Sequence, residues 1–242
     1  MLKEFVEKIV SLGGTKTFEV NGEVFADGEF KQVRPALDIQ ERKELTSLDA
    51  LVKMIRHEAV ADLDQYPIFV AVNSYNEVNC FTKPYAQLRN QRVWLYEAHA
   101  TDVPGMDSST KYGFEQAQIA LQTRFQETAD RGYLLRLCSQ ITCGGKVTYN
   151  DNGVATTIVT QKGVALQGNE TIKPLVELRP YRTFQEVEQP ESLFLIRIDE
   201  RGISFTEADG GMWKLKARET VKAFLEEKLS DAISEGKVVV TL

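Results

Sequence analysis

The chain has little of what disulfide-bonded and many catalytic proteins depend on, because its 242 residues include only two histidines and three cysteines. Cys80, Cys138 and Cys143 show no Cys-x-x-Cys spacing, so neither a disulfide framework nor a structural zinc site is indicated, and a reducing compartment is favoured. No apolar run approaches the length that spans a bilayer. This absence predicts a soluble, cytoplasmic protein.

The motifs of three large enzyme classes are also missing. The chain contains no Gly-x-Ser-x-Gly pattern, no Walker phosphate loop and no Rossmann fingerprint. Serine hydrolases, P-loop nucleotide triphosphatases and dinucleotide oxidoreductases are therefore disfavoured. We predict no cofactor and no bound metal, and we expect a non-enzymatic protein rather than an enzyme.

Basic residues are outnumbered by acidic ones, 29 to 35, which gives a formal net charge of −6. Such a chain lacks the broad positive field that non-specific binding to double-stranded nucleic acid requires, although a local basic patch is still compatible with it. Hydrophobic residues make up 43% of the sequence. The chain can therefore bury a full core, as one large domain or as two packed subdomains.

Several segments carry the alternation and the turn residues of β-structure. The longest hairpin is predicted at 144–163, where two β-rich runs flank an Asn-Asp-Asn-Gly turn. A second hairpin is predicted at 17–25, because Asn-Gly between alternating runs is the strongest short hairpin signal. The runs 68–72, 78–81 and 92–98 predict an antiparallel meander. Further strands are expected at 175–178, 193–198 and 203–206.

Apolar residues at helical spacing predict amphipathic helices at 2–12, about 46–60, 114–125 and 133–141. A carboxy-terminal helix is predicted from residues that share one face, Val221, Phe224, Leu225, Leu229 and Ile233. We therefore predict an α+β fold, with antiparallel β-sheets and long hairpins packed against several amphipathic helices. A boundary between Pro104 and Lys111 separates subdomains 1–106 and 107–242, unless the two form one continuous domain.

One histidine lies in a pattern that allows chemistry. Glu97 and His99 are two residues apart, which on a strand places both side chains on one face, and Asp102 follows closely. Because imidazole with a carboxylate is a common ligating and acid–base pair, a metal-dependent hydrolase that uses Glu97 and His99 is one alternative. The spacing supplies no third ligand and lacks the zinc-deaminase pattern. We therefore expect a solvated, replaceable pair at a strand end.

Two segments combine basic and aromatic residues. If they met in space, they would form a compact cationic surface with stacking partners for a phosphate-bearing ligand or single-stranded nucleic acid. The neighbouring acids Glu207, Asp209 and Glu219 favour the plainer interpretation of a charged loop and a solvated helix start. The candidate ligand-binding residues are Arg179, Tyr181, Arg182, Trp213, Lys214, Lys216 and Arg218.

The order of these elements is similar to that of the YfdQ-like family of uncharacterised phage and prophage proteins. The similarity covers most of the chain and rests on the helix that begins Leu45-Thr46-Ser47-Leu48, the meander with 69–72, the helix pair before the Gly-Gly hairpin, and the segment 180–184 that leads to 193–205. It implies a phage-encoded cytoplasmic accessory protein. It transfers no catalytic or binding residues.

Together these observations predict non-enzymatic binding of a host factor, a nucleotide or nucleic acid, with a role in countering host defence among the options. A phage structural or assembly protein is an alternative. The long hairpins at 17–25 and 144–163 favour self-association into a homo-oligomer, because exposed strands can pair across subunits. We expect no membrane partner.

Overall fold

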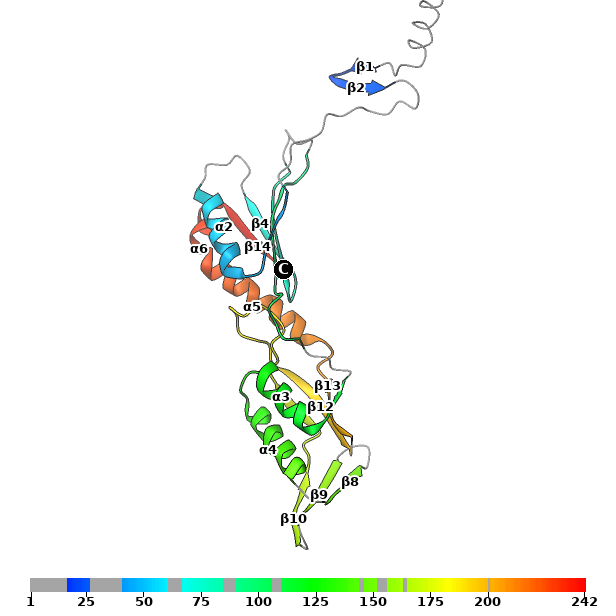
Figure 1. The fold of residues 1–242 in the computed structure, drawn as a ribbon. Coiled ribbons are helices and arrows are strands. Elements are labelled where there is room, and N and C mark those ends of the chain that lie inside the picture. Colours follow the sequence, from blue (N-terminus) through cyan, green and yellow to red (C-terminus); the bar gives the residue numbers. More distant parts are fainter. Residues whose placement is uncertain are drawn as a thin grey trace, which may run out of the picture. The chain divides into compact units, whose positions relative to one another are not determined.

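A computed structural model describes residues 17–26, 41–60, 67–84, 90–105, 110–143, 146–151, 156–162, 165–199 and 201–242 (Figure 1). The chain divides into two compact units, Met1–Ile39 and Gln40–Leu242, so the predicted boundary at 106/107 falls inside the second unit. The helix predicted at 2–12 lies outside the described residues.

In the first unit, β1 (Thr17–Val20) and β2 (Glu23–Ala26) form the predicted hairpin. Its turn residues Asn21 and Gly22 both have positive φ angles, 52° and 78°. Two consecutive positive φ angles are what a type I′ turn requires, and Asn-Gly adopts them at the lowest cost. The Asn-Gly signal in the sequence is thereby confirmed.

The second unit contains a five-stranded sheet ordered β14-β4-β5-β6-β3. Strands β4 (Ile68–Ser74), β5 (Glu77–Thr82) and β6 (Trp94–His99) form the predicted antiparallel meander. The outer strands β3 (Lys43–Leu45) and β14 (Val238–Thr241) run parallel to β6 and β4. The sheet is therefore mixed, a feature that the sequence did not predict.

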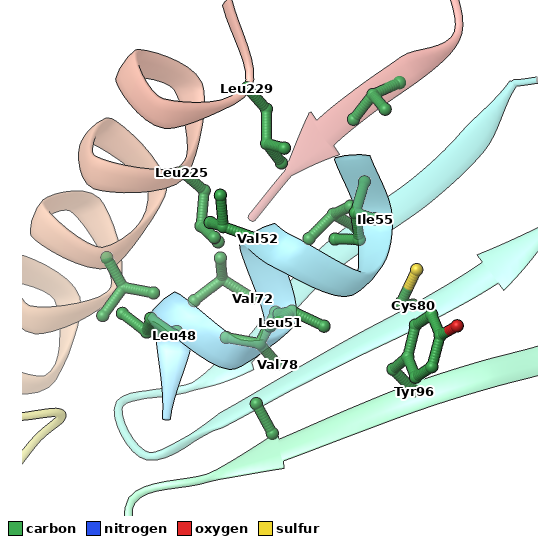
Figure 2. Close-up of a cluster of buried hydrophobic side chains, with 14 of the residues drawn as sticks. Leu48, Leu51, Val52, Ile55, Val72, Val78, Cys80, Tyr96, Leu225 and Leu229 are labelled. Atoms are coloured by element: carbon green, nitrogen blue, oxygen red, sulfur yellow. The ribbon is translucent and has the colours of Figure 1, made fainter. Parts of the chain in front are cut away.

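Three helices cover one face of this sheet: α2 (Leu48–Val60), α5 (Met212–Lys228) and α6 (Ser230–Ser234). Figure 2 shows side chains of α2 packed among those of the sheet and of the end of α5, and Leu48, Leu51 and Ile55 are completely buried. The sequence predicted this helix at about 46–60, close to the observed bounds of α2. Ser47 Oγ accepts a hydrogen bond from the Ala50 amide at 3.0 Å, which satisfies one of the free N–H groups of the first turn.

A four-stranded antiparallel sheet ordered β11-β12-β13-β7 carries a second core. Its strands are β7 (Lys111–Tyr112), β11 (Leu175–Leu178), β12 (Ser192–Asp199) and β13 (Gly202–Glu207), and α3 (Phe114–Arg124) and α4 (Ala129–Cys143) pack against them. Gly202 has a φ of 136°, and a Cβ there would lie 2.0 Å from the Tyr112 carbonyl oxygen. Only glycine therefore allows β13 to approach β7 this closely.

A third sheet, ordered β10-β9-β8, is antiparallel throughout. Strands β8 (Lys146–Asp151) and β9 (Thr156–Lys162) are the predicted long hairpin, and β10 (Ala165–Thr171) adds a strand that was not predicted. Residues 144–145 and 152–155, at the start of this hairpin and in its turn, lie outside the described residues.

The segment 179–191 links the core of the five-stranded sheet to the second core. Phe184 and Val187 belong to the core of the five-stranded sheet, whereas the flanking Leu178 and Phe194 belong to the second core. The buried amide of Gln189 organises the segment: Oε1 accepts from the backbone N–H groups of residues 182 and 183 at 2.8 and 3.1 Å, and Nε2 donates to the residue 184 carbonyl at 2.9 Å. These buried polar groups are satisfied locally.

The described part of the chain is therefore α+β, as the sequence predicted. No helix within these residues combines the length and the apolar character that crossing a bilayer would need.

Candidate functional site

The face of the five-stranded sheet opposite the helices carries two adjoining groups of side chains. Strand register aligns Val239, Phe69, Phe81 and Trp94 across β14, β4, β5 and β6, and we call these four residues the aromatic row. Side chains alternate between the faces of a strand. A β-bulge beside Leu95 lets Leu95 and Tyr96 both contact the core, while Trp94 remains against Phe81.

The aromatic row is packed together and partly open to solvent. The Phe69 and Phe81 rings stack at 5.7 Å, and Phe81 contacts Trp94 at 5.0 Å. Arg92 lies over both phenylalanine rings, at 5.3 and 5.2 Å from their centroids. Trp94 and Val239 are 45% and 41% exposed. The row therefore presents an apolar surface with one guanidinium group beside it.

The second group lies on the same face, and we call Arg42, Glu77, Asn79, Glu97 and His99 the polar cluster. Glu97 is at its centre: Oε1 lies 2.8 Å from His99 Nε2, and Oε2 lies 2.5 Å from Arg42 Nη1. Glu97 is only 6% exposed. The prediction that Glu97 and His99 share one strand face is confirmed, but the prediction of a solvated pair is wrong, because the sheet buries the carboxylate.

Glu77 is an acidic member of the polar cluster that the sequence did not reveal. It lies opposite His99 in the β5–β6 register, and its Oε1 accepts hydrogen bonds from Asn73 Nδ2 at 3.1 Å and Asn79 Nδ2 at 2.9 Å. One ligand atom each of Glu77, Glu97 and His99 lies within 4.8 Å of the other two. Asp102 is elsewhere, lining a cavity of about 290 Å³ beside the start of α2.

Arg182 and Trp213, both predicted ligand contacts, are brought together but face each other inside the protein. The Arg182 guanidinium lies 4.3 Å from the Trp213 ring centroid and 5.1 Å from that of Phe194. It donates to Ser192 Oγ at 2.8 Å and pairs with Glu207 at 3.2 Å. Burial lowers the pKa of Arg182, and the carboxylates of Glu207 and Asp209 oppose that shift.

The other five predicted ligand-binding residues are dispersed around this contact. Arg179 and Lys216 line a cavity of about 480 Å³, but Glu188, Glu191 and Glu219 line it too, and Arg179 pairs with Glu188 at 2.9 Å. Because three carboxylates face two cations, this cavity has no surplus of positive charge for an anion. The remaining three residues contact the protein itself: Lys214 the Tyr75 and Trp213 rings, Arg218 the Val72 carbonyl, and Tyr181 the Arg124 carbonyl through its backbone N–H.

The buried thiols are poor nucleophiles. Burial raises the pKa of Cys138 to about 11, and it raises the pKa of Cys80 further, with a contribution from the Glu58 carboxylate. Only the thiolate form attacks electrophiles. These two buried cysteines are therefore packing residues, while the Cys143 side chain lies outside the described part of the chain.

No family model, no curated protein and no solved structure matches this chain.

Proposed function

We propose that this chain is a non-enzymatic binding protein that holds a polypeptide partner on the open face of its five-stranded sheet. The observation that supports this proposal is the aromatic row, in which Trp94 and Val239 are exposed beside stacked rings and a guanidinium group. Exposed apolar patches mark interaction surfaces, and tryptophan and arginine are the residues that most often dominate binding energy at such surfaces.

The charges on this face favour a polypeptide over a nucleic acid. Three carboxylates, those of Glu44, Glu77 and Glu97, share the face with the guanidinium groups of Arg42 and Arg92. A phosphate chain needs a surplus of positive charge, which this face does not offer. A polypeptide segment with an apolar side chain for the aromatic row and a basic side chain for Glu44 complements it.

The biological setting is part of the same proposal. The similarity to the YfdQ-like family suggests an accessory protein of a phage, acting in the cytoplasm of the infected host on a host protein. A role in countering host defence fits a protein that works by binding. Self-association is the competing occupant of this face, and the experiment below separates the two.

Site-specific photo-crosslinking tests the proposal in producing cells. A photoreactive phenylalanine analogue replaces Trp94 in one variant and Ile119 in a control, because Ile119 is also exposed, at 57%, but lies on α3 against the other core. We expect a discrete crosslinked protein from position 94 and none from position 119. Mass spectrometry of the product then distinguishes a host protein from a second copy of this chain.

The purified partner provides the decisive measurement. Trp94→Ala should raise the dissociation constant about 30-fold, since truncating a central tryptophan typically costs about 2 kcal/mol or more. Ile119→Ala should leave the constant unchanged. Equal crosslinking at both positions, or equal affinity of both alanine variants, would contradict binding at the aromatic row.

A further inference from the structure

We propose that the polar cluster is a binding site for a divalent transition-metal ion, held by the carboxylates of Glu77 and Glu97 and the imidazole of His99. The inference goes beyond the proposed partner binding, because it concerns the polar cluster and not the aromatic row. It also differs from the sequence prediction of no bound metal, since the third ligand became visible only with the strand register.

The ligand atoms are close to the separation that one ion requires. Each of the three atoms lies within 4.8 Å of the other two. Two ligands bonded to one tetrahedral zinc ion at about 2.0–2.2 Å lie about 3.3–3.6 Å apart. Side-chain movements of up to roughly 1.5 Å therefore complete the site, and Glu77 and His99 are only half-buried, which leaves them room to move.

Two buried acceptor oxygens in the same cluster give an independent indication of a cation. Asn79 is 5% exposed, and its Oδ1 has no hydrogen-bond partner, although its Nδ2 donates to Glu77 Oε1. Glu97 Oε2 also lacks a hydrogen bond, because Arg42 Nη1 approaches it as an ion pair without hydrogen-bond geometry. Buried polar atoms in folded proteins are nearly always satisfied. Both oxygens belong to residues of the polar cluster, and a cation bound there would lie near them.

Arg42 and His99 both contact the Glu97 carboxylate, so a metal ion must compete with these contacts to bind it. Arg42 is 42% exposed at its side chain and reaches the cluster from the residue before β3, so it can withdraw when an ion supplies the positive charge. His99 Nε2 must give up its contact with Glu97 Oε1 to bind an ion. Metal binding therefore replaces the Arg42–Glu97 ion pair and the His99–Glu97 contact, and the affinity reflects this exchange.

The mixture of ligands selects the class of ion. Calcium and magnesium prefer oxygen ligands alone, whereas imidazole with carboxylates suits zinc, and manganese accepts the same set. Soft ions such as monovalent copper need sulfur, and the cluster has none. We therefore use zinc as the probe, and we expect magnesium to bind far more weakly.

Isothermal titration calorimetry of the full chain, stripped with EDTA and titrated with zinc chloride alone, tests the site. We expect one zinc ion per chain, and a dissociation constant that rises at least tenfold in Glu77→Gln and in His99→Gln, because each variant removes one of three ligands. Glu44→Gln and His57→Gln are the matched controls, since Glu44 lies beside Glu97 in the strand register and His57 is the other histidine, exposed on α2. Both should bind within twofold of the parent chain.

The variants are chosen so that every outcome is informative. Glu77 and His99 are not fully buried, so their glutamine variants should fold, which circular dichroism checks before titration. Absence of zinc binding by the parent chain would overturn the site, as would equal affinities of Glu77→Gln, His99→Gln and the two controls. Trp94→Ala should keep its zinc affinity. Failure of the metal site and failure of the partner surface are thereby distinguishable.

Discussion

Replacing Arg182 by alanine should destabilise the protein by about 3 kcal/mol, because this side chain holds together the contact between the two cores. The substitution removes the charged hydrogen bond to Ser192 at 2.8 Å, worth about 1.5–3 kcal/mol. It also removes cation–π contacts with Trp213 and Phe194, worth about 0.5–2 kcal/mol each. Glu207 is 34% exposed and regains water, which keeps the loss at the lower end of the range of about 3–5 kcal/mol for broken buried pairs.

Urea unfolding followed by tryptophan fluorescence measures this loss. With an m-value of about 3 kcal/mol/M, the midpoint should fall by about 1 M while the m-value stays constant. Arg179→Ala is the control, since its ion partner Glu188 is 70% exposed and such surface pairs contribute at most about 1 kcal/mol. If Arg182→Ala cost no more than Arg179→Ala, the structural role would be refuted and Arg182 would again be a candidate ligand contact.

Two further predictions concern the two buried thiols and the start of α2. In a Cys143→Ser background at pH 7, iodoacetamide should leave the folded chain unlabelled, because raised pKa values keep Cys80 and Cys138 protonated. Intact-mass spectrometry should show that both thiols are labelled in urea and that labelling of the folded chain rises slowly toward pH 11. Rapid labelling of the folded chain at pH 7 would contradict the burial of these thiols. Glu186→Ala should lower the free energy of unfolding, measured by urea denaturation, by about 1 kcal/mol, because Glu186 Oε1 accepts a hydrogen bond from the Leu48 amide at 2.7 Å and caps α2. Substitution of the exposed neighbour, Gln185→Ala, is the control. Equal losses in the two variants would show that the cap contributes nothing.

The elements that the sequence predicted are those whose signals are local. Asn21-Gly22 defines its turn without help from the rest of the chain, and the meander from β4 to β6 follows from three neighbouring β-rich runs. The two outer strands, β3 and β14, were not predicted, each for a different reason. Lys43–Leu45 is too short to show an alternation, and Val238–Thr241 pairs with a strand from the other half of the chain, a partner that no local pattern reveals.

Only part of the polar cluster could be predicted, because local spacing is visible in the sequence whereas the pairing of distant residues across strands is not. The two-residue spacing placed Glu97 and His99 on one face, but Glu77 joins them only through the β5–β6 register, which a bulge near Phe81 shifts. The basic and aromatic segments at 179–182 and 213–218 do meet, as the hypothesis required. Their composition could not reveal that Arg182 and Trp213 would satisfy each other inside the protein, because an internal cation–π contact and a ligand site use the same residue types.

The parallel pairing of β14 with β4 sets the order in which the chain can finish folding. The second core draws all its buried residues from 112–205, whereas the first needs residues 48–98 together with Phe184, Val187 and 221–238. During synthesis the second core can therefore close before α5 and β14 have been made, and the sheet that carries the aromatic row waits for both. A chain without β14 would hold one finished core beside a sheet whose β4 edge is unpaired, and unpaired edges of this kind are templates for aggregation.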